Sequence, residues 1–326
     1  MAGHADLPTA AARIVKKSDV FAALKAIDSN AASRQRVLDM ENEFAKKIGT
    51  HLSGLPAKNS RFSKFHTNPF VLMFYAKQKG FDRVSQIEEH LVPAKVFSSM
   101  ETSAGNMVEK VVLPIYGWEP VQSAMQSHKT LLDGRMVEKA SGRFVGATLK
   151  SGPRTLNDDM AHNIGRDLVS RAPSWAVDHG VKEIDFTYAA LYGTLKQSNK
   201  KDWHILRNIE ELRPAQSKVT VSHKGAWCIS YTDGPLKVTA TVRVGIDWWD
   251  YLGGTNAWIE LCCALIRCCI APTTVAQQAA SYTIFDLPAI IDTSKLDPSF
   301  NVSILQKSQF EWLLFIARHF CDDYAD

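Results

Sequence analysis

The feature that most constrains the fold is a block of strand-like sequence enclosed by helical sequence on both sides. Residues 217–249, SKVTVSHKGAWCISYTDGPLKVTATVRVGIDWW, alternate apolar and polar side chains and predict two or three antiparallel strands. EIDFTYAALYG at 183–193 reads as a further, buried strand. Strands embedded between helices favour an α/β or α+β fold, with a central mixed sheet flanked by helices.

The two ends of the chain predict helices. Apolar spacing through Phe21, Leu24 and Ile27 indicates a first helix, which Ser18 or Asp19 could cap. Further helices are expected at 33–48, 68–81, 84–100, 255–269 and 308–320. We therefore expect a single domain over 1–326, with a core at about 99–250, a helical N-terminal region at about 10–98 and a helical C-terminal addition.

Charge and composition limit the possible partners and locations. The net charge is +4 over 326 residues, so any basic surface for a polyanion must be local. The first residues lack the apolar core of a secretory signal, and no run of about 18 apolar residues occurs, so we expect a cytoplasmic protein without membrane association. Cys262, Cys263, Cys268 and Cys269 do not have zinc-ligand spacing and are expected to act as small apolar residues of a helix.

The most informative chemistry lies in a predicted hairpin formed by residues 129–138 and 142–150. Its turn would bring Asp133 and Lys150 together at one end. Hydrolysis of a phosphodiester needs carboxylates for Mg²⁺ and a nearby cation for the attacking water and the charged transition state. A second carboxylate would fit two residues before the lysine, but this position is Thr148.

Another segment must therefore supply the missing acid. Glu109, on a predicted helix GNMVEKVV before the hairpin, is the first choice. Asp158 and Asp159 come next, followed by Glu101 and Glu138. From spacing alone, an aspartate and a lysine on neighbouring strands are also compatible with ordinary surface residues.

Two motifs resemble type II restriction endonucleases of the PD-(D/E)xK superfamily. These are TSAGNMVEKVVLPIYGW at 102–118 and KSGPRTLN at 150–157, within a resemblance that covers roughly residues 65–210. The resemblance implies a restriction-endonuclease-like fold and Mg²⁺ as cofactor. It implies Asp133 as main metal ligand, Lys150 as the residue that orients water and holds the scissile phosphate, and Glu109 as accessory acid and metal ligand. Several such enzymes also carry a neutral residue where Thr148 stands.

Candidate DNA contacts follow the lysine of the hairpin. Arg154, Asn157 and Asp158 could reach base edges in the major groove, or they could cap the following helix instead. Lys200 and Lys201, with Lys196, form a basic cluster suited to phosphates, although a solvated surface explains it equally well. A second basic cluster, Lys58, Arg61, Lys64 and His66, has the same two explanations.

The function expected from the resemblance is Mg²⁺-dependent, sequence-specific cleavage of double-stranded DNA. A short palindromic site, for example a GC-rich one such as CCCGGG, would suit a homodimer. A cognate DNA methyltransferase would be the functional partner. Two alternatives stay open: a DNA-binding protein whose nuclease site is degenerate at Thr148, and an unrelated metabolic enzyme. The sequence has no Walker or dinucleotide-binding motif.

Overall fold

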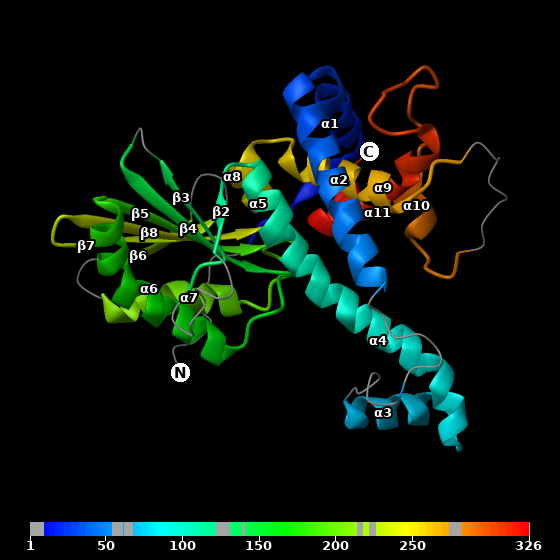
Figure 1. The fold of residues 1–326 in the computed structure, drawn as a ribbon, viewed down its shortest axis with the longest axis horizontal. Coiled ribbons are helices and arrows are strands. Elements are labelled where there is room, and N and C mark those ends of the chain that lie inside the picture. The colour runs from blue at the N-terminus through cyan, green and yellow to red at the C-terminus, as the bar shows by residue number, and fades with distance from the viewer. Residues whose placement is uncertain are drawn as a thin grey trace.

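A central mixed sheet with helices on both sides forms the body of the protein (Figure 1), as the sequence predicts. The computed structural model describes residues 10–53, 61, 68–121, 131–138, 141–213, 218–221, 226–273 and 282–325. Within these residues, no helix combines the length and the apolar character needed to cross a bilayer.

The sheet has seven strands in the order β2-β3-β4-β5-β8-β7-β6. Its strands are β2 (Glu119–Pro120), β3 (Gly134–Glu138), β4 (Arg143–Lys150), β5 (Glu183–Ala190), β6 (Lys218–Val221), β7 (Trp227–Asp233) and β8 (Leu236–Val244). The three central strands, β4, β5 and β8, are parallel, whereas the outer strands pair antiparallel. The sheet is therefore a parallel centre with an antiparallel extension on each side.

The strand register places the carboxyl ends of the parallel strands level with one another. Lys150 pairs with Ala190, and Ala190 pairs with Val244. In the neighbouring hairpin, Gly134 pairs with Ala147. The start of β3 and the end of β4 therefore lie at the same edge of the sheet.

One face of the sheet is covered by α6 (Asp158–His179) and α7 (Lys201–Leu212). Asn157 caps α6 by accepting a hydrogen bond from the backbone N–H of Met160, which confirms the predicted cap. Large side chains fill this layer: Phe144, Phe186, Tyr188, Leu168, Trp203 and Ile205 are all buried. The residues at 144, 186 and 188 alternate along their strands, as the two-residue period of a strand requires.

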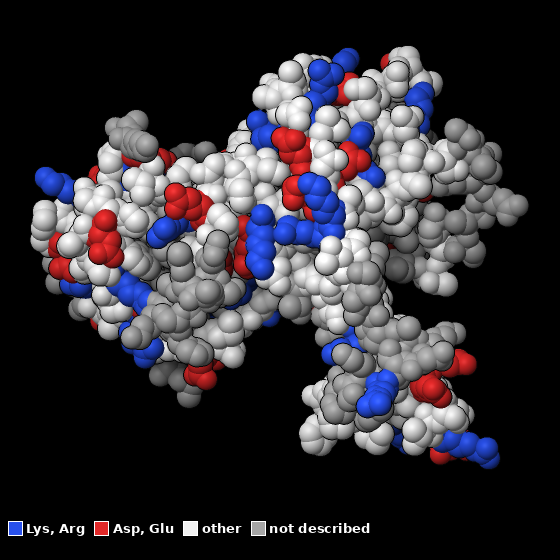
Figure 2. Space-filling model, in the orientation of Figure 1, with Lys and Arg blue, Asp and Glu red and all other residues white. Residues whose placement is uncertain are grey.

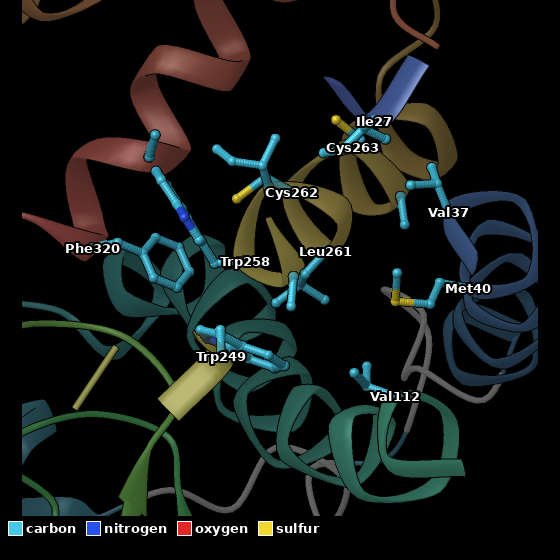
Figure 3. Packing of buried hydrophobic residues seen from close by; sticks show 14 of the residues in the cluster. Ile27, Val37, Met40, Val112, Trp249, Trp258, Leu261, Cys262, Cys263 and Phe320 are labelled. Atoms are coloured by element: carbon cyan, nitrogen blue, oxygen red, sulfur yellow. The ribbon is translucent and has the colours of Figure 1, made fainter. Parts of the chain in front are cut away.

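The opposite layer is built by helices from both ends of the chain. They are α1 (Lys17–Ser29), α2 (Ala31–Ser53), α8 (Ile246–Gly253), α9 (Ala257–Cys269), α10 (Leu287–Ile291) and α11 (Phe310–Ala317). Figure 3 shows Cys262, Cys263, Leu261 and Trp258 of α9 among side chains of the surrounding helices. Cys262 and Cys263 are fully buried, which agrees with their expected apolar role, and Trp248 and Trp249 also belong to this core.

A pair of helices extends away from this body (Figure 1). The first is α3 (Pro69–Lys79), capped by Asn68 and ended by Gly80, which takes a left-handed conformation. The second is α4 (Val84–Met107), which continues through the π-helical turn η3 (Val108–Val112) into α5 (Leu113–Ile115). The helix predicted for 84–100 is therefore much longer than expected and returns to the body at η3.

Several local expectations were wrong. The end of the alternating block, around Trp248, is helix α8 rather than strand, because Gly245 turns the chain with a φ of 57°. The first helix begins at Lys17, so Ser18 and Asp19 lie in its first turn rather than at its cap. β3 begins at Gly134, directly after Asp133. A small parallel pair between β1 (Ile14–Lys16) and β9 (Asp323–Ala325) joins the two ends of the chain and has no local sequence signal.

Candidate active site

The candidate site begins with Asp133, the residue that precedes β3. Its backbone N–H donates to the carbonyl oxygen of Ala147 at 2.8 Å, so it continues the hairpin ladder. Its carboxylate Oδ2 accepts a hydrogen bond from the backbone N–H of Leu149 at 2.7 Å. The carboxylate is therefore fixed against the last residues of β4.

Lys150 ends β4 at this same edge. Its carbonyl oxygen accepts from the N–H of Leu191 at 2.9 Å, which fixes its backbone against the end of β5. Burial raises the pKa of Asp133, whereas the N–H of Leu149 and the positive charge of Lys150 oppose this rise. The lysine is thus close enough to stabilise the ionised aspartate, as the hairpin geometry predicts.

Glu109 reaches the site from the π-helical turn η3. Burial raises the pKa of Glu109 first, and the negative charge of Asp133 raises it further, whereas Lys110 and Lys150 lower it. The structure therefore brings Glu109, Asp133 and Lys150 within electrostatic reach of one another. Lys110 also contributes its charge to this group. The sequence analysis did not identify it as a site residue, and only its position next to Glu109 could have indicated that role.

Thr148 is buried, with 4% of its surface exposed. Its hydroxyl donates to the carbonyl oxygen of Leu131 at 2.5 Å, and it lies 3.3 Å from Asp133 Oδ2. A hydroxyl has one proton, so the short bond to Leu131 leaves a weaker contact with Asp133. Thr148 thus joins β4 to the residues that precede β3, next to the aspartate, and contributes no carboxylate.

The other acids considered from the sequence are engaged elsewhere or point to solvent. Asp158 forms an ion pair with Lys201 at 2.5 Å. Glu138 pairs with Arg143 at 2.8 Å near the turn of the hairpin, the end opposite Asp133. Asp159 and Glu101 are exposed on α6 and α4. Of the acids proposed from sequence, Glu109 is the one that adds its charge to the Asp133–Lys150 pair.

The two carboxylates of the site, Asp133 and Glu109, are possible ligands of Mg²⁺. This ion commonly binds through one or two carboxylates and keeps several waters or substrate phosphate oxygens. Asp133 and Glu109 supply two carboxylates whose pKa values are raised chiefly by burial, and a bound cation would stabilise their ionised forms. No group of three or more His, Cys, Asp or Glu side chains suited to a metal occurs in the described part of the chain. The residues fit a site of two carboxylates and do not form an all-protein cage.

The segment after Lys150 is held by specific local contacts. A Cβ at Gly152 would lie 2.7 Å from the ring of Tyr192, so a side chain there would have to displace this ring. Thr155 Oγ1 donates to the carbonyl oxygen of Gly152 at 2.9 Å, and Leu156 is buried. The KSGPRTLN segment is therefore a rigid connection between β4 and α6.

The residues expected to contact DNA lie in two adjoining loops and at the first residues of α6 and α7, which follow these loops. Asn199 joins these loops by donating from Nδ2 to the carbonyl oxygen of Leu156 at 2.9 Å. Arg154 is exposed and donates to the carbonyl oxygen of Gln197 at 3.0 Å. Lys200 donates to the carbonyl oxygen of Leu195 and lies over the ring of Trp227. Each of these side chains thus has an intramolecular contact, as do Asn157 at its cap and Asp158 with Lys201.

Lysine and arginine side chains do not form one continuous field on the face drawn in Figure 2. Blue and red groups alternate there, with several basic side chains near the middle of the view. Arg61 of the second basic cluster is exposed, whereas Lys58, Lys64 and His66 lie outside the described residues. On this face the described residues therefore present no broad basic surface to a polyanion.

Comparison with known proteins adds no family to this description. The chain matches no protein-family model and no curated protein sequence.

Proposed function

We propose that the chain is a Mg²⁺-dependent endonuclease that hydrolyses phosphodiester bonds of double-stranded DNA, of the type II restriction class. The observation that carries this proposal is the meeting of Asp133 and Lys150 at one edge of a mixed sheet, with Glu109 beside them. The hairpin with an acid before one strand and a lysine at the end of the next supports a PD-(D/E)xK site.

Each residue has a role that its position supports. Asp133 and Glu109 would hold Mg²⁺, which supplies Lewis acidity and neutralises charge on the phosphate. Lys150 carries a positive charge next to them and can hold the scissile phosphate or orient a water molecule for in-line attack. The N–H of Leu149 fixes the Asp133 carboxylate, so the acid is oriented before substrate arrives.

DNA would be held by the loops that precede α6 and α7. Arg154 is the best-placed side chain there, because it is exposed and has to give up only its hydrogen bond to the carbonyl oxygen of Gln197 to contact DNA. Lys201 and Asp158 would have to leave their ion pair, and Asn157 its cap, to read a base. A cytoplasmic homodimer acting on a palindromic site, together with a cognate methyltransferase, completes this proposal.

Incubation with supercoiled plasmid tests the activity directly. Purified protein should give discrete fragments with Mg²⁺ and none with EDTA. Lys150→Met should still retain DNA at low salt without cutting it, which also excludes a contaminating nuclease. Wild-type protein that retains DNA but never cuts it in Mg²⁺ or Mn²⁺ would refute cleavage.

The second candidate is a DNA-binding protein with a non-cleaving nuclease fold. The observation that favours it is buried Thr148, which supplies a hydroxyl where a carboxylate would complete the site. Retention of duplex DNA without nicking, unchanged by EDTA, would support this candidate. A protein that neither retains nor cuts DNA would contradict both functions.

A further inference from the structure

A pocket of about 580 Å³ lies between α2, α4 and the C-terminal end of α9. Lys47 and His51 line it from α2, Ser103 and Met107 from α4, and Cys269 from the end of α9. Lys110, on η3, also lines the pocket. The pocket has the size of a small-molecule site, and Lys110 of its lining also belongs to the charged group around Glu109.

The charged side chains that line this pocket are basic. Lys47 and Lys110 supply two ammonium groups, and none of the described lining residues is an aspartate or a glutamate. Carboxylates lie behind this lining: Glu41 is within electrostatic reach of Cys268, Glu43 of Lys47 and Glu109 of Lys110. Glu41 is already paired with Arg267 at 2.6 Å. The lining therefore favours an anionic ligand over a cationic or neutral one.

His51 adds an unfulfilled hydrogen-bonding group to this lining. Its Nδ1 lies 2.8 Å from Ser103 Oγ. Its other ring nitrogen, Nε2, is buried and has no hydrogen-bond partner among the described residues. When the serine hydroxyl donates to Nδ1, Nε2 carries a proton, and a buried donor of this kind is stabilised by an acceptor.

Apart from Asn106, the remaining lining residues are apolar side chains or cysteines. Ile48, Met100, Ala104 and Met107 give the pocket more apolar than polar surface. Methionine side chains adapt to ligands of varied shape. A bare inorganic anion would leave these walls uncovered, whereas a ligand with an apolar body would cover them.

We propose that this pocket binds a small organic anion, a carboxylate or a phosphate monoester carried on an apolar body. The anionic head lies between Lys47 and Lys110, and the body lies against the methionines. Lys110 is common to the pocket and to the Asp133–Lys150–Glu109 group, but neither Asp133 nor Lys150 lines the pocket, so variants of Lys47 test this proposal separately from the nuclease function.

Calorimetric titration with octanoate and with phenyl phosphate tests the proposal and distinguishes the two head groups. At least one of them should bind, and Lys47→Met should weaken that binding at least tenfold, whereas Lys47→Arg should restore it. Lys46→Met is the matched control, because Lys46 is the exposed neighbour that pairs with Glu43 and does not line the pocket. Equal affinity of wild-type protein and Lys47→Met, or equal binding of octanol and octanoate, would overturn the proposal.

Thiol labelling gives a second, local readout. Cys269 lines the pocket and is exposed, whereas Cys228 lies on β7 and serves as an internal reference. The bound anion should slow alkylation of Cys269 at least threefold and leave Cys228 unchanged. Binding that protects neither thiol, or both equally, would place the ligand elsewhere and refute this site.

Discussion

The backbone N–H of Leu149 lies 2.7 Å from Oδ2 of Asp133 and donates to it. This bond crosses the hairpin one residue before Lys150, so the position of the aspartate is set by the same strand that presents the lysine. A carboxylate that accepts a backbone hydrogen bond is held in one rotamer, which is what a metal ligand or a charge partner requires.

Replacing either member of this pair should abolish cleavage and preserve the fold. Asp133→Asn keeps the size of the side chain and its acceptor for Leu149 but removes the charge, so cleavage should fall by a factor of about 10³ or more. Lys150→Met should have a similar effect. Plasmid cleavage rates with thermal unfolding curves measure this, and Glu138→Gln, near the other end of the hairpin, should cleave at the wild-type rate.

Thr148 should contribute to stability through its bond to the Leu131 carbonyl oxygen. Thr148→Val keeps the shape but leaves this acceptor without its donor, at a cost of about 1–2 kcal/mol in the free energy of unfolding. Chemical denaturation measures the change. Thr232→Val, on the exposed side of β7, is the control and should alter stability by less than about 0.5 kcal/mol. Equal effects of the two substitutions would mean that the hydroxyl of Thr148 makes no useful bond.

Asp28 should make part of the stability dependent on pH. Burial raises the pKa of Asp28, but hydrogen bonds from the Ser303 hydroxyl and from the N–H groups of Ser303 and Ile304 together outweigh it, so the pKa is lowered. A lowered pKa stabilises the fold above the ordinary value of about 4, and this contribution disappears as pH falls through the folded value. Asp28→Asn should therefore melt at a lower temperature than wild type at pH 7, and the gap should narrow as the pH falls below about 4. A gap of constant size over this range would contradict the assignment.

Gly245 should tolerate no side chain. Its φ is 57°, and a Cβ there would lie 2.2 Å from the carbonyl oxygen of Gly193. Gly245→Ala should cost at least about 3 kcal/mol, because backbone rather than a flexible side chain must move. Gly49→Ala is the contrast: Gly49 is exposed within α2 with open space around its Cβ position, so alanine should stabilise by about 0.5–1 kcal/mol. The urea midpoints of both variants, compared with that of the wild type, test these two predictions.

Replacing Glu260 should lower the stability of the fold more than replacing an exposed acid of the same helical layer. It is buried and accepts from Arg36 at 2.6 and 2.7 Å and from Tyr116 at 2.7 Å. Glu260→Gln leaves the guanidinium without its counter-charge and should cost about 3 kcal/mol. Glu43→Gln breaks an exposed pair with Lys46 and should leave the melting temperature almost unchanged. Similar melting temperatures for the two variants would show that the buried pair contributes little.

The local parts of the fold and site could be predicted from the sequence. The hairpin places Asp133 near Lys150 because both belong to one short segment, and Asn157 caps α6 because capping depends on neighbouring residues. Cys262 and Cys263 are buried because helix α9 is apolar on most sides. Each of these results depends on interactions between residues close together in the chain.

The remaining parts depend on contacts between distant segments. The alternating pattern that ends near Trp248 gives no sign that the chain turns at Gly245, because that turn follows from packing against Gly193. The alternating pattern also does not show that β8 pairs parallel with β5. The position of Glu109 depends on where the long helix α4 returns to the sheet, and the pocket beside Lys47 needs three separate helices. Periodicity describes each element alone and carries no information on these arrangements.

The parallel centre of the sheet also has a kinetic consequence. The hairpin of β3 and β4 joins neighbouring segments and can form within microseconds, whereas β4, β5 and β8 pair only after two helical crossovers have closed. Asp133 and Lys150 thus come together early in folding, and Glu109 joins them when the long helix docks. A newly synthesised chain would therefore bring Asp133 and Lys150 together before the docking of α4 adds Glu109 to them.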